Sequence, residues 1–265
     1  MHPEADPDPE WVAALAGSSL ARATRAIAEA AAERRLYAHL ARQHHSEGRT
    51  SYVEIDAPLE LYALVRLLRP HHVVEVGVSS GVSSAYLLRA MEANGRGRLH
   101  SVDLARRPRP AGRDSTVPRS SWTLPPGRGS GWAVPRGLHR RWDLRLGDKR
   151  KVLPLLGAEG LEVSLFVYDV PHDEADAYRE FRALDARMPV GGVAIADHGP
   201  SGDLCRALRR WAGERGATPV RRANLGLYGF RCDRPASPVP AETATGGDPP
   251  VAPDRPPRAR RSPGR

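Results

Sequence analysis

A glycine-rich turn between a predicted strand and a predicted helix carries the residues best suited to hold a ligand. The chain reads EVGVSSGVSS over residues 75–84, directly after a short apolar stretch. Glycine permits positive φ values and close backbone approach, so Gly77 and Gly81 fit a tight turn that lets a ligand touch the main chain. We expect Ser83 or Ser84 to cap the helix that follows.

An acid on each side of this turn narrows the class of ligand. A dinucleotide fingerprint, G-x-G-x-x-G, brings a pyrophosphate to a helix N-terminus. Here Glu75 stands two residues before Gly77, where a carboxylate would repel a pyrophosphate but suits a ligand with an amino group and a sulfonium cation. Asp103 ends the next predicted strand, where its carboxylate can accept hydrogen bonds from both hydroxyls of a ribose. The residues therefore indicate that the ligand is a nucleoside carrying a positively charged group.

Short apolar stretches alternate with helical ones through most of the chain. We expect strands at 72–76, 98–102, 141–146, 163–168 and 193–196, and helices at 58–68, 83–94, 150–156, 173–187 and 204–213. A hairpin-like pair at 218–222 and 226–232 closes the array. This repetition predicts an α/β fold with a doubly wound, mostly parallel, seven-stranded Rossmann-like sheet covered on both faces. Residues 11–44 predict one or two preceding helices, and 51–55 a short extended piece.

Four acids stand at the ends of successive predicted strands, namely Asp103, Asp148, Asp169 and Asp197. Ligands of open α/β sheets bind just beyond the carboxyl ends of the strands. We therefore expect the four acids to converge on one crevice.

Three segments fall outside the alternating array. Residues 105–141 contain nine arginines and one acid, a local charge of about +8. We interpret this long loop as a lid whose charge favours an anionic substrate, the alternative being a loop merely held down by Trp122 and Trp132. Residues 1–10 and 234–265 hold too few large apolar groups to offset the entropy of ordering, so we expect both to be disordered.

Composition limits the cellular setting. The formal charge is +9, but Lys149 and Lys151 are the only lysines among 40 basic residues, which is typical of a biased bacterial proteome and gives little reason to expect nucleic acid as a partner. We expect Cys205 and Cys232 to be buried thiols in a reducing compartment. With no signal peptide or membrane span in the sequence, we expect a cytoplasmic protein.

The turn and the acid after it resemble motif I and the acidic loop of class I S-adenosylmethionine-dependent methyltransferases. The resemblance covers about residues 50–232, so we expect a methyltransferase domain over 51–233 behind a helical segment at 11–50. It is strongest to a bacterial group with largely unassigned substrates, similar to metal-dependent O-methyltransferases. The stretches that carry it are 61–70, 73–84, 97–104, 131–135, 141–148 and 152–154.

The resemblance implies a role for each matching position. The residues that would line the methionine and ribose parts of S-adenosylmethionine are Glu75, Gly77, Ser79, Gly81 and Ser83. Asp103 would take the ribose hydroxyls and Asp148 would lie by the adenine. Asp169 would lie near the sulfonium and the acceptor.

The acceptor side departs from the family pattern. Asp169-Val-Pro-His172 lacks the Thr-Tyr or Ser-Tyr pair that often follows, and Asp197-His198 stands where relatives carry Asp-Asp or Asp-Asn. Two routes to proton removal fit these residues. Either Asp169, Asp197 and His198 bind a divalent cation, Mg²⁺ or Mn²⁺, or one of His172 and His198 acts as a general base.

Structural roles compete with these catalytic ones. Asp197-His198 can cap the turn that follows, and His172 can cap or pack. We expect the histidine pairs 44–45 and 71–72 to be surface residues.

The leading hypothesis is O-methylation of a small molecule, a sugar or a secondary metabolite. The alternatives are an RNA or other nucleic-acid methyltransferase, suggested by the basic loop, and a non-catalytic cofactor-binding protein, suggested by the altered 169–178 segment. A nicotinamide dehydrogenase is the weakest alternative. The sequence leaves the acceptor, the metal requirement and homo-oligomer formation open.

Overall fold

A computed structural model of the protein describes residues 6–46, 57–104, 124, 127–170, 173–197, 202–222 and 226–236. The expected extended piece at 51–55 lies outside this part of the chain. Most of the segments expected to be disordered, 1–10 and 234–265, also lie outside it, as do residues 105–123 and 125–126 of the predicted lid. The expectation of disorder is wrong for Pro9 and Glu10, which begin a helix that Asp8 caps.

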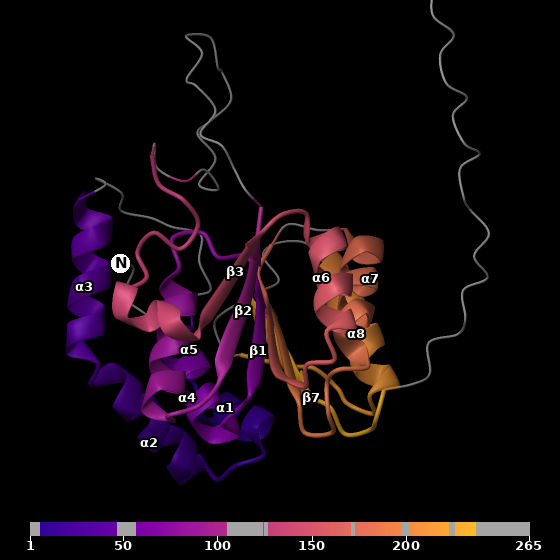
Figure 1. The fold of residues 1–265 in the computed structure, drawn as a ribbon. Helices are drawn as coiled ribbons and strands as arrows, with labels where there is room; N and C mark the ends of the chain where they lie inside the picture. The colour runs from indigo at the N-terminus through magenta and orange to yellow at the C-terminus, as the bar shows by residue number, and fades with distance from the viewer. Residues whose placement is uncertain are drawn as a thin grey trace, which may run out of the picture.

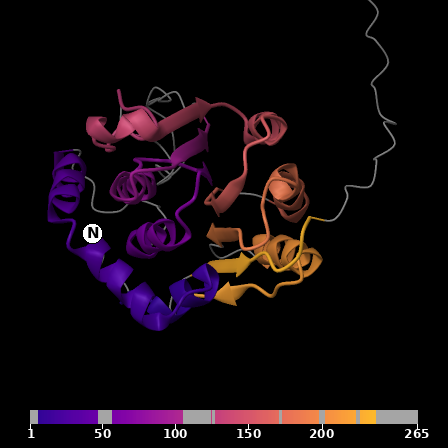
Figure 2. The same ribbon diagram turned by 60° about the horizontal axis from the view of Figure 1, so that its bottom comes forward.

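Seven strands form one sheet in the order β3-β2-β1-β4-β5-β7-β6 (Figures 1 and 2). Their bounds are β1 His72–Val76, β2 Arg98–Asp103, β3 Trp142–Leu146, β4 Val163–Tyr168, β5 Val193–Asp197, β6 Val220–Arg221 and β7 Leu227–Arg231. The first five strands in this order are parallel, and β7 runs antiparallel to β5 and β6. The predicted seven-stranded, mostly parallel sheet and its closing hairpin are therefore confirmed.

The strands alternate their side chains between two apolar cores. Val73 and Val167 face the core on one side of the sheet, whereas Val74 and Phe166 face the core on the other. Successive residues of a strand point to opposite faces, so a strand that is apolar throughout is stable only when both faces are covered. Short apolar runs in this sequence are thus suited to the interior of a doubly wound sheet.

Helices cover both faces. On one side lie α1 Pro9–Ala16, α2 Leu20–Ala31, α3 Arg34–Ser46, α4 Pro58–Leu68, α5 Val82–Ala93 and the 3₁₀ helix η1 Arg136–Arg141. On the other side lie α6 Lys149–Ala158, α7 Glu174–Asp185 and α8 Gly202–Glu214. Figure 1 shows the two layers on either side of the sheet. None of the described helices is long and apolar enough to cross a membrane.

The amino-terminal segment forms three helices, so the expectation of one or two is wrong. Gly17 ends α1 in the left-handed conformation with φ 58°, and the Ser19 side chain then caps α2. Both are ordinary helix-end signals, and they override the helix-favouring alanines on either side of them. The segment folds back along the domain, and α1 and α2 both pack on α4.

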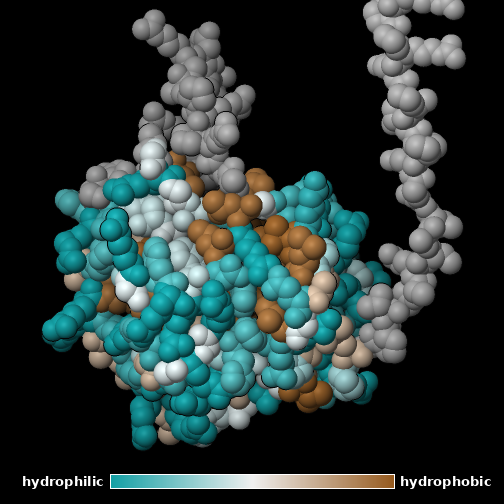
Figure 3. All heavy atoms as spheres, viewed as in Figure 1, coloured by the Kyte–Doolittle hydropathy of each residue, from teal (hydrophilic) through white to brown (hydrophobic). Residues whose placement is uncertain are grey.

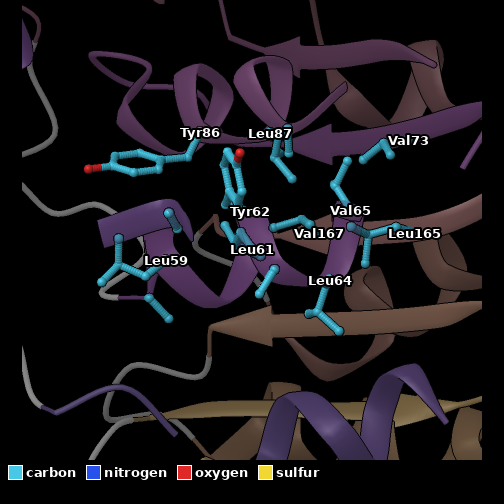
Figure 4. Packing of buried hydrophobic residues seen from close by; sticks show 14 of the residues in the cluster. Leu59, Leu61, Tyr62, Leu64, Val65, Val73, Tyr86, Leu87, Leu165 and Val167 are labelled. Atoms are coloured by element: carbon cyan, nitrogen blue, oxygen red, sulfur yellow. The ribbon is translucent and has the colours of Figure 1, made fainter. Parts of the chain in front are cut away.

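Helix α4 occupies the centre of the first core. Its residues from Pro58 to Val65 are all buried, Glu60 included, because α4 lies between α5, the sheet and the amino-terminal helices (Figure 4). The Glu60 carboxylate is paired with Arg222 at 2.6 Å, which supplies the partner that a buried charge requires.

The second core is built around aromatic rings and one buried ion pair. Phe181 and Trp211 stack with ring centroids 5.1 Å apart. Asp185 and Arg215 are both fully buried and meet at 2.8 Å, and the Trp211 indole N–H donates to the same carboxylate. Cys205 and Cys232 are buried free thiols, as expected.

Candidate active site

The carboxyl ends of four neighbouring strands bring three of the four predicted acids to one edge of the sheet. Asp103 is the last residue of β2, Asp169 follows β4 directly, and Asp197 is the last residue of β5. Tyr168 of β4 is paired with Ala196 of β5, so Asp169 and Asp197 are the next residues on adjacent parallel strands. Neighbouring strands lie about 4.8 Å apart, which keeps these two acids close together.

Asp148, the fourth predicted acid, forms the cap of a helix. It is the N-cap of α6, and its carboxylate accepts from the Arg150 backbone N–H and pairs with the Arg150 guanidinium at 2.9 Å. The hydrogen bond from Arg150 lowers the pKa of Asp148. Its described contacts are those of a helix cap just after β3, and Gly147 before it donates to the Asp103 carbonyl at 2.8 Å. Its predicted place by the adenine stays a prediction.

Three residues of the turn after β1 have positive φ: Gly77 at 94°, Ser79 at 49° and Gly81 at 94°. A Cβ on Gly77 would lie 1.9 Å from the Asp169 carbonyl oxygen, and one on Gly81 would lie 2.6 Å from a Val134 methyl group. The glycines are therefore required by neighbouring protein atoms. The predicted approach of a ligand to this backbone stays a prediction.

The backbone of the turn orients the Asp103 carboxylate. The Ser79 N–H donates to Asp103 Oδ2 at 3.2 Å, and the Leu104 N–H donates to Oδ1 at 2.8 Å. An ionised carboxylate has about four lone-pair positions, so these bonds leave capacity to accept more. Asp103 is half-buried and faces the edge where the strands end.

Glu75 lies between the sheet and α5 with 1% of its surface exposed. Its carboxylate accepts from the hydroxyls of Ser83 and Ser84 on α5, at 2.7 and 2.6 Å, and from Ser101 on β2 at 2.7 Å. Burial raises the pKa of Glu75, and the three hydroxyls act against that rise. These contacts fix α5 to the sheet.

These contacts bear on two expectations. Glu75 is buried beneath the turn and both of its oxygens accept from protein hydroxyls, so its shown role is to hold α5, and its predicted role toward a bound cation stays a prediction. Neither Ser83 nor Ser84 caps α5: the N-cap is Gly81, in the left-handed conformation and without a side-chain cap.

Two leucines that sequence reasoning overlooked flank Asp103. Leu146 is paired with Asp103 across β3 and β2, and Leu104 follows Asp103 directly. Their exposed fractions are 53% and 51%, which is high for large apolar side chains. Figure 3 shows hydrophobic residues gathered in the upper middle of this face of the molecule. The sequence signal for Leu104 was an apolar residue just after a strand-end acid, whereas Leu146 ends its own strand two residues before Asp148.

A polar network supports the end of β4 from below. The Lys149 ammonium donates to the Tyr168 hydroxyl at 2.8 Å and to Glu180 at 2.6 Å, and Tyr168 donates to the same carboxylate. Burial, followed by the charge of Glu180, raises the pKa of Tyr168, so the hydroxyl stays protonated. Because Tyr168 precedes Asp169, the network holds the strand end in place. Sequence reasoning missed it, since its three members are far apart along the chain.

Residues 127–141 are folded onto the domain. The Gly131 N–H donates to the Ser79 carbonyl at 2.8 Å, so this stretch lies directly beside the turn. His44 on α3 also reaches the turn and is half-buried there, which makes the expectation of a surface position wrong for His44. His72 is likewise half-buried, against His100, whereas His45 and His71 are exposed.

The structure describes only some of the residues predicted to be catalytic or to bind a metal. Asp169 and Asp197 are half-buried at the sheet edge. His172 and His198 lie outside the described residues, as does the alternative that Asp197-His198 caps the next turn. In the part of the chain that the structure describes, no group of three or more His, Cys, Asp or Glu side chains could hold a metal ion.

Comparison with known proteins agrees with this architecture. Residues 74–198 match the family model described as a methyltransferase domain. No curated protein sequence matches the chain. The O-methyltransferase TomG from Streptomyces achromogenes, solved with SAM, is 19% identical over 74% of this chain and 89% of TomG, with a TM-score of 0.51. Cofactor-bound Rv0187 from MTB is 18% identical over 75% and 90% of the two chains, with a TM-score of 0.50.

At these identities the solved structures establish the fold. The strand order, the turn after β1 and the family match together identify residues 74–198 as a methyltransferase domain of the class I fold.

Proposed function

We propose that the protein is an S-adenosylmethionine-dependent O-methyltransferase that acts on a small molecule. The observation that carries the proposal is the turn at residues 77–81, which holds the Asp103 carboxylate through the Ser79 N–H at the open edge of the sheet. The matching family model and the SAM-bound fold relative TomG support the same reading.

The residues around Asp103 suit the nucleoside part of this cofactor. The carboxylate would accept hydrogen bonds from the two ribose hydroxyls. The exposed Leu104 and Leu146 side chains would cover the adenine ring, which gains from removing apolar surface from water. Ser79 would line the ribose and methionine parts, together with the backbone of Gly77 and Gly81. Glu75 and Ser83 would act from beneath by fixing the turn.

The acceptor would lie on the Asp169 and Asp197 side of the edge. S-adenosylmethionine, when bound, supplies an activated methyl group for in-line transfer. The protein's tasks are then to orient the acceptor oxygen and to remove its proton. We propose that Asp169, together with His172 or His198, removes the proton from the acceptor oxygen. Asp169, Asp197 and His198 are proposed as ligands of Mg²⁺ or Mn²⁺, because oxygen-rich sites with one imidazole suit these ions.

The acceptor class is proposed from a fold relative and from charge. We propose that the acceptor is a sugar or a secondary metabolite. The fold relative TomG is an O-methyltransferase involved in tomaymycin synthesis. The nine arginines of residues 105–141 favour an anionic acceptor, and that stretch is proposed as the lid. We also propose that the protein is cytoplasmic, comes from a bacterium and assembles with further copies of the chain.

Calorimetric titration with S-adenosylhomocysteine tests the cofactor assignment. We expect binding by the full chain and weaker binding by Asp103→Asn. Repeating the titration with Mg²⁺ or Mn²⁺, and with Asp197→Ala, tests the cation. Transfer of a labelled methyl group to a panel of hydroxylated acceptors tests the reaction. Absence of any S-adenosylhomocysteine binding would refute the proposal, and binding without turnover on any acceptor would favour a non-catalytic role.

A further inference from the structure

Residues 131–134 clamp the turn from the side opposite β4. The Gly131 N–H donates to the Ser79 carbonyl at 2.8 Å, and the Ala133 N–H donates to the Ser80 carbonyl at 3.0 Å. A Cβ on Gly81 would lie 2.9 Å from the Gly131 Cα atom, so the two backbones are in direct contact. Gly131 and Ala133 thus bond to the carbonyls of two successive turn residues.

Two histidines of α3 join this clamp. The His44 Nε2 atom lies 3.1 Å from the Ser80 hydroxyl oxygen, and the two groups share a hydrogen bond. One turn earlier, the His39 Nε2 atom lies 3.1 Å from the Ala133 carbonyl oxygen. The His44 ring also packs against Trp132, with ring centroids 5.6 Å apart. Helix α3 thus holds both the turn and the segment that clamps it.

His44 holds the residue next to the strained position of the turn. Ser79 has a φ of 49°, which a residue with a side chain seldom adopts, and such strain persists only where the surroundings enforce it. Ser80 is fully buried, and its hydroxyl and its carbonyl bond to His44 and Ala133 respectively. Anchoring Ser80 in this way restrains the neighbouring residue Ser79, whose N–H donates to Asp103.

We propose that His44 is a positioning residue of the cofactor site, which acts through Ser80 and Ser79 on the orientation of Asp103. This inference rests on the proposed function. It adds to that function a residue from the amino-terminal helices, 36 positions before Ser80 in the sequence. Burial lowers the pKa of His44, so near pH 7 the ring is neutral and has one donor and one acceptor nitrogen. Either nitrogen role satisfies a serine hydroxyl.

The test is calorimetric titration of the full chain with S-adenosylhomocysteine. His44→Ala removes the anchor, and we expect the dissociation constant to rise about fivefold, the usual effect of one neutral hydrogen bond. His44→Gln should stay within about twofold of the unsubstituted protein, because a glutamine amide reaches the place of Nε2 and offers both a donor and an acceptor. A merely structural role of the imidazole ring would not be rescued in this way.

Two further variants identify the path and supply the control. Ser80→Ala should weaken binding by a similar factor, and the loss in the double variant with His44→Ala should be clearly smaller than the sum of the two, because both remove the same hydrogen bond while the ring contact with Trp132 is lost only with His44. Ser80→Ala also keeps the test open if His44→Ala fails to fold. His45→Ala changes an exposed neighbour on the same helix and should bind like the unsubstituted protein.

The outcomes separate this inference from the proposed function. If the unsubstituted protein binds S-adenosylhomocysteine and both folded single variants match it within about twofold, the role of His44 is overturned and the proposed function stands. Fully additive losses in the double variant would also overturn it, because the two side chains would then act independently. If the unsubstituted protein does not bind at all, both are overturned.

Discussion

Replacing Gly77 with alanine tests whether the turn is held by contact with the end of β4. The new Cβ would lie 1.9 Å from the Asp169 carbonyl oxygen and 2.9 Å from its carbonyl carbon. To reach even a tight contact of about 3 Å, the two backbones must separate by roughly 1 Å. That movement breaks or stretches the Asp169 N–H to Val76 carbonyl bond of 2.8 Å and the Gly77 N–H to Val102 carbonyl bond of 2.9 Å.

The expected loss of stability follows from these contacts. Alanine at a positive φ costs about 1–2 kcal/mol, and each weakened backbone hydrogen bond costs about 1 kcal/mol. Gly77→Ala should therefore lower the free energy of unfolding by roughly 3–4 kcal/mol. For a domain of this size that corresponds to a fall in Tm of about 10 °C. Urea unfolding followed by circular dichroism measures the first quantity, and a thermal scan measures the second.

Gly95→Ala is the matched control. Gly95 also has a positive φ, 69°, but nothing lies within 4 Å of the position that its Cβ would take. It should show the backbone strain alone, about 1 kcal/mol. If the two variants were equally stable within about 0.5 kcal/mol, the contact between the turn and Asp169 would not be the reason for glycine at position 77.

Three further predictions address other parts of the molecule. Asp103→Asn should weaken S-adenosylhomocysteine binding about tenfold or more, because hydrogen bonds to charged groups contribute about 1.5–3 kcal/mol; the Tm without ligand should change little, and unaltered affinity would contradict the ribose assignment. Asp185→Asn should lower the free energy of unfolding by about 3 kcal/mol, since Arg215 stays buried without its counter-charge; Arg215→Met added to it should restore part of the loss, and a purely additive loss would refute this. The third prediction concerns pH. Burial lowers the pKa of His72 and of His100, whose rings share a hydrogen bond of 3.0 Å. The charged or titratable groups around the pair are His71, Arg98, Asp143, Arg145 and Glu162. Near pH 6.5 these histidines bind protons in the unfolded chain but not in the folded protein, so the free energy of unfolding should fall as the pH drops below about 6.5. The fall should be less steep in His100→Asn, and equal slopes would exclude this linkage.

Most of the fold followed from local patterns. The apolar runs at 72–76 and 163–168 became β1 and β4 with the predicted bounds, because both faces of a parallel sheet must be apolar. The break at 17–19 between α1 and α2 escaped prediction, although Gly17 and Ser19 are ordinary helix-end residues, since the surrounding alanines suggested continuity.

The candidate site was predictable in its location and less so in its contacts. Asp103, Asp169 and Asp197 lie at strand ends, and strand order alone brings those ends to one edge. Asp148 has the same sequence pattern, but its side chain caps α6. A carboxylate after a strand can serve a ligand or a helix N-terminus, and only its hydrogen-bond partners distinguish the two.

The sequence by itself determined that a glycine-rich turn follows β1, with acids placed on both sides of it. It determined this because strand, turn and helix signals are local and span about ten residues. Only the tertiary structure decided what those residues contact. Glu75 proved to be a buried anchor for three serines, and Gly77 proved necessary for contact with Asp169. His44 reached the turn from the amino-terminal helices. Such contacts join residues dozens of positions apart, and they depend on which helix faces cover which side of the sheet.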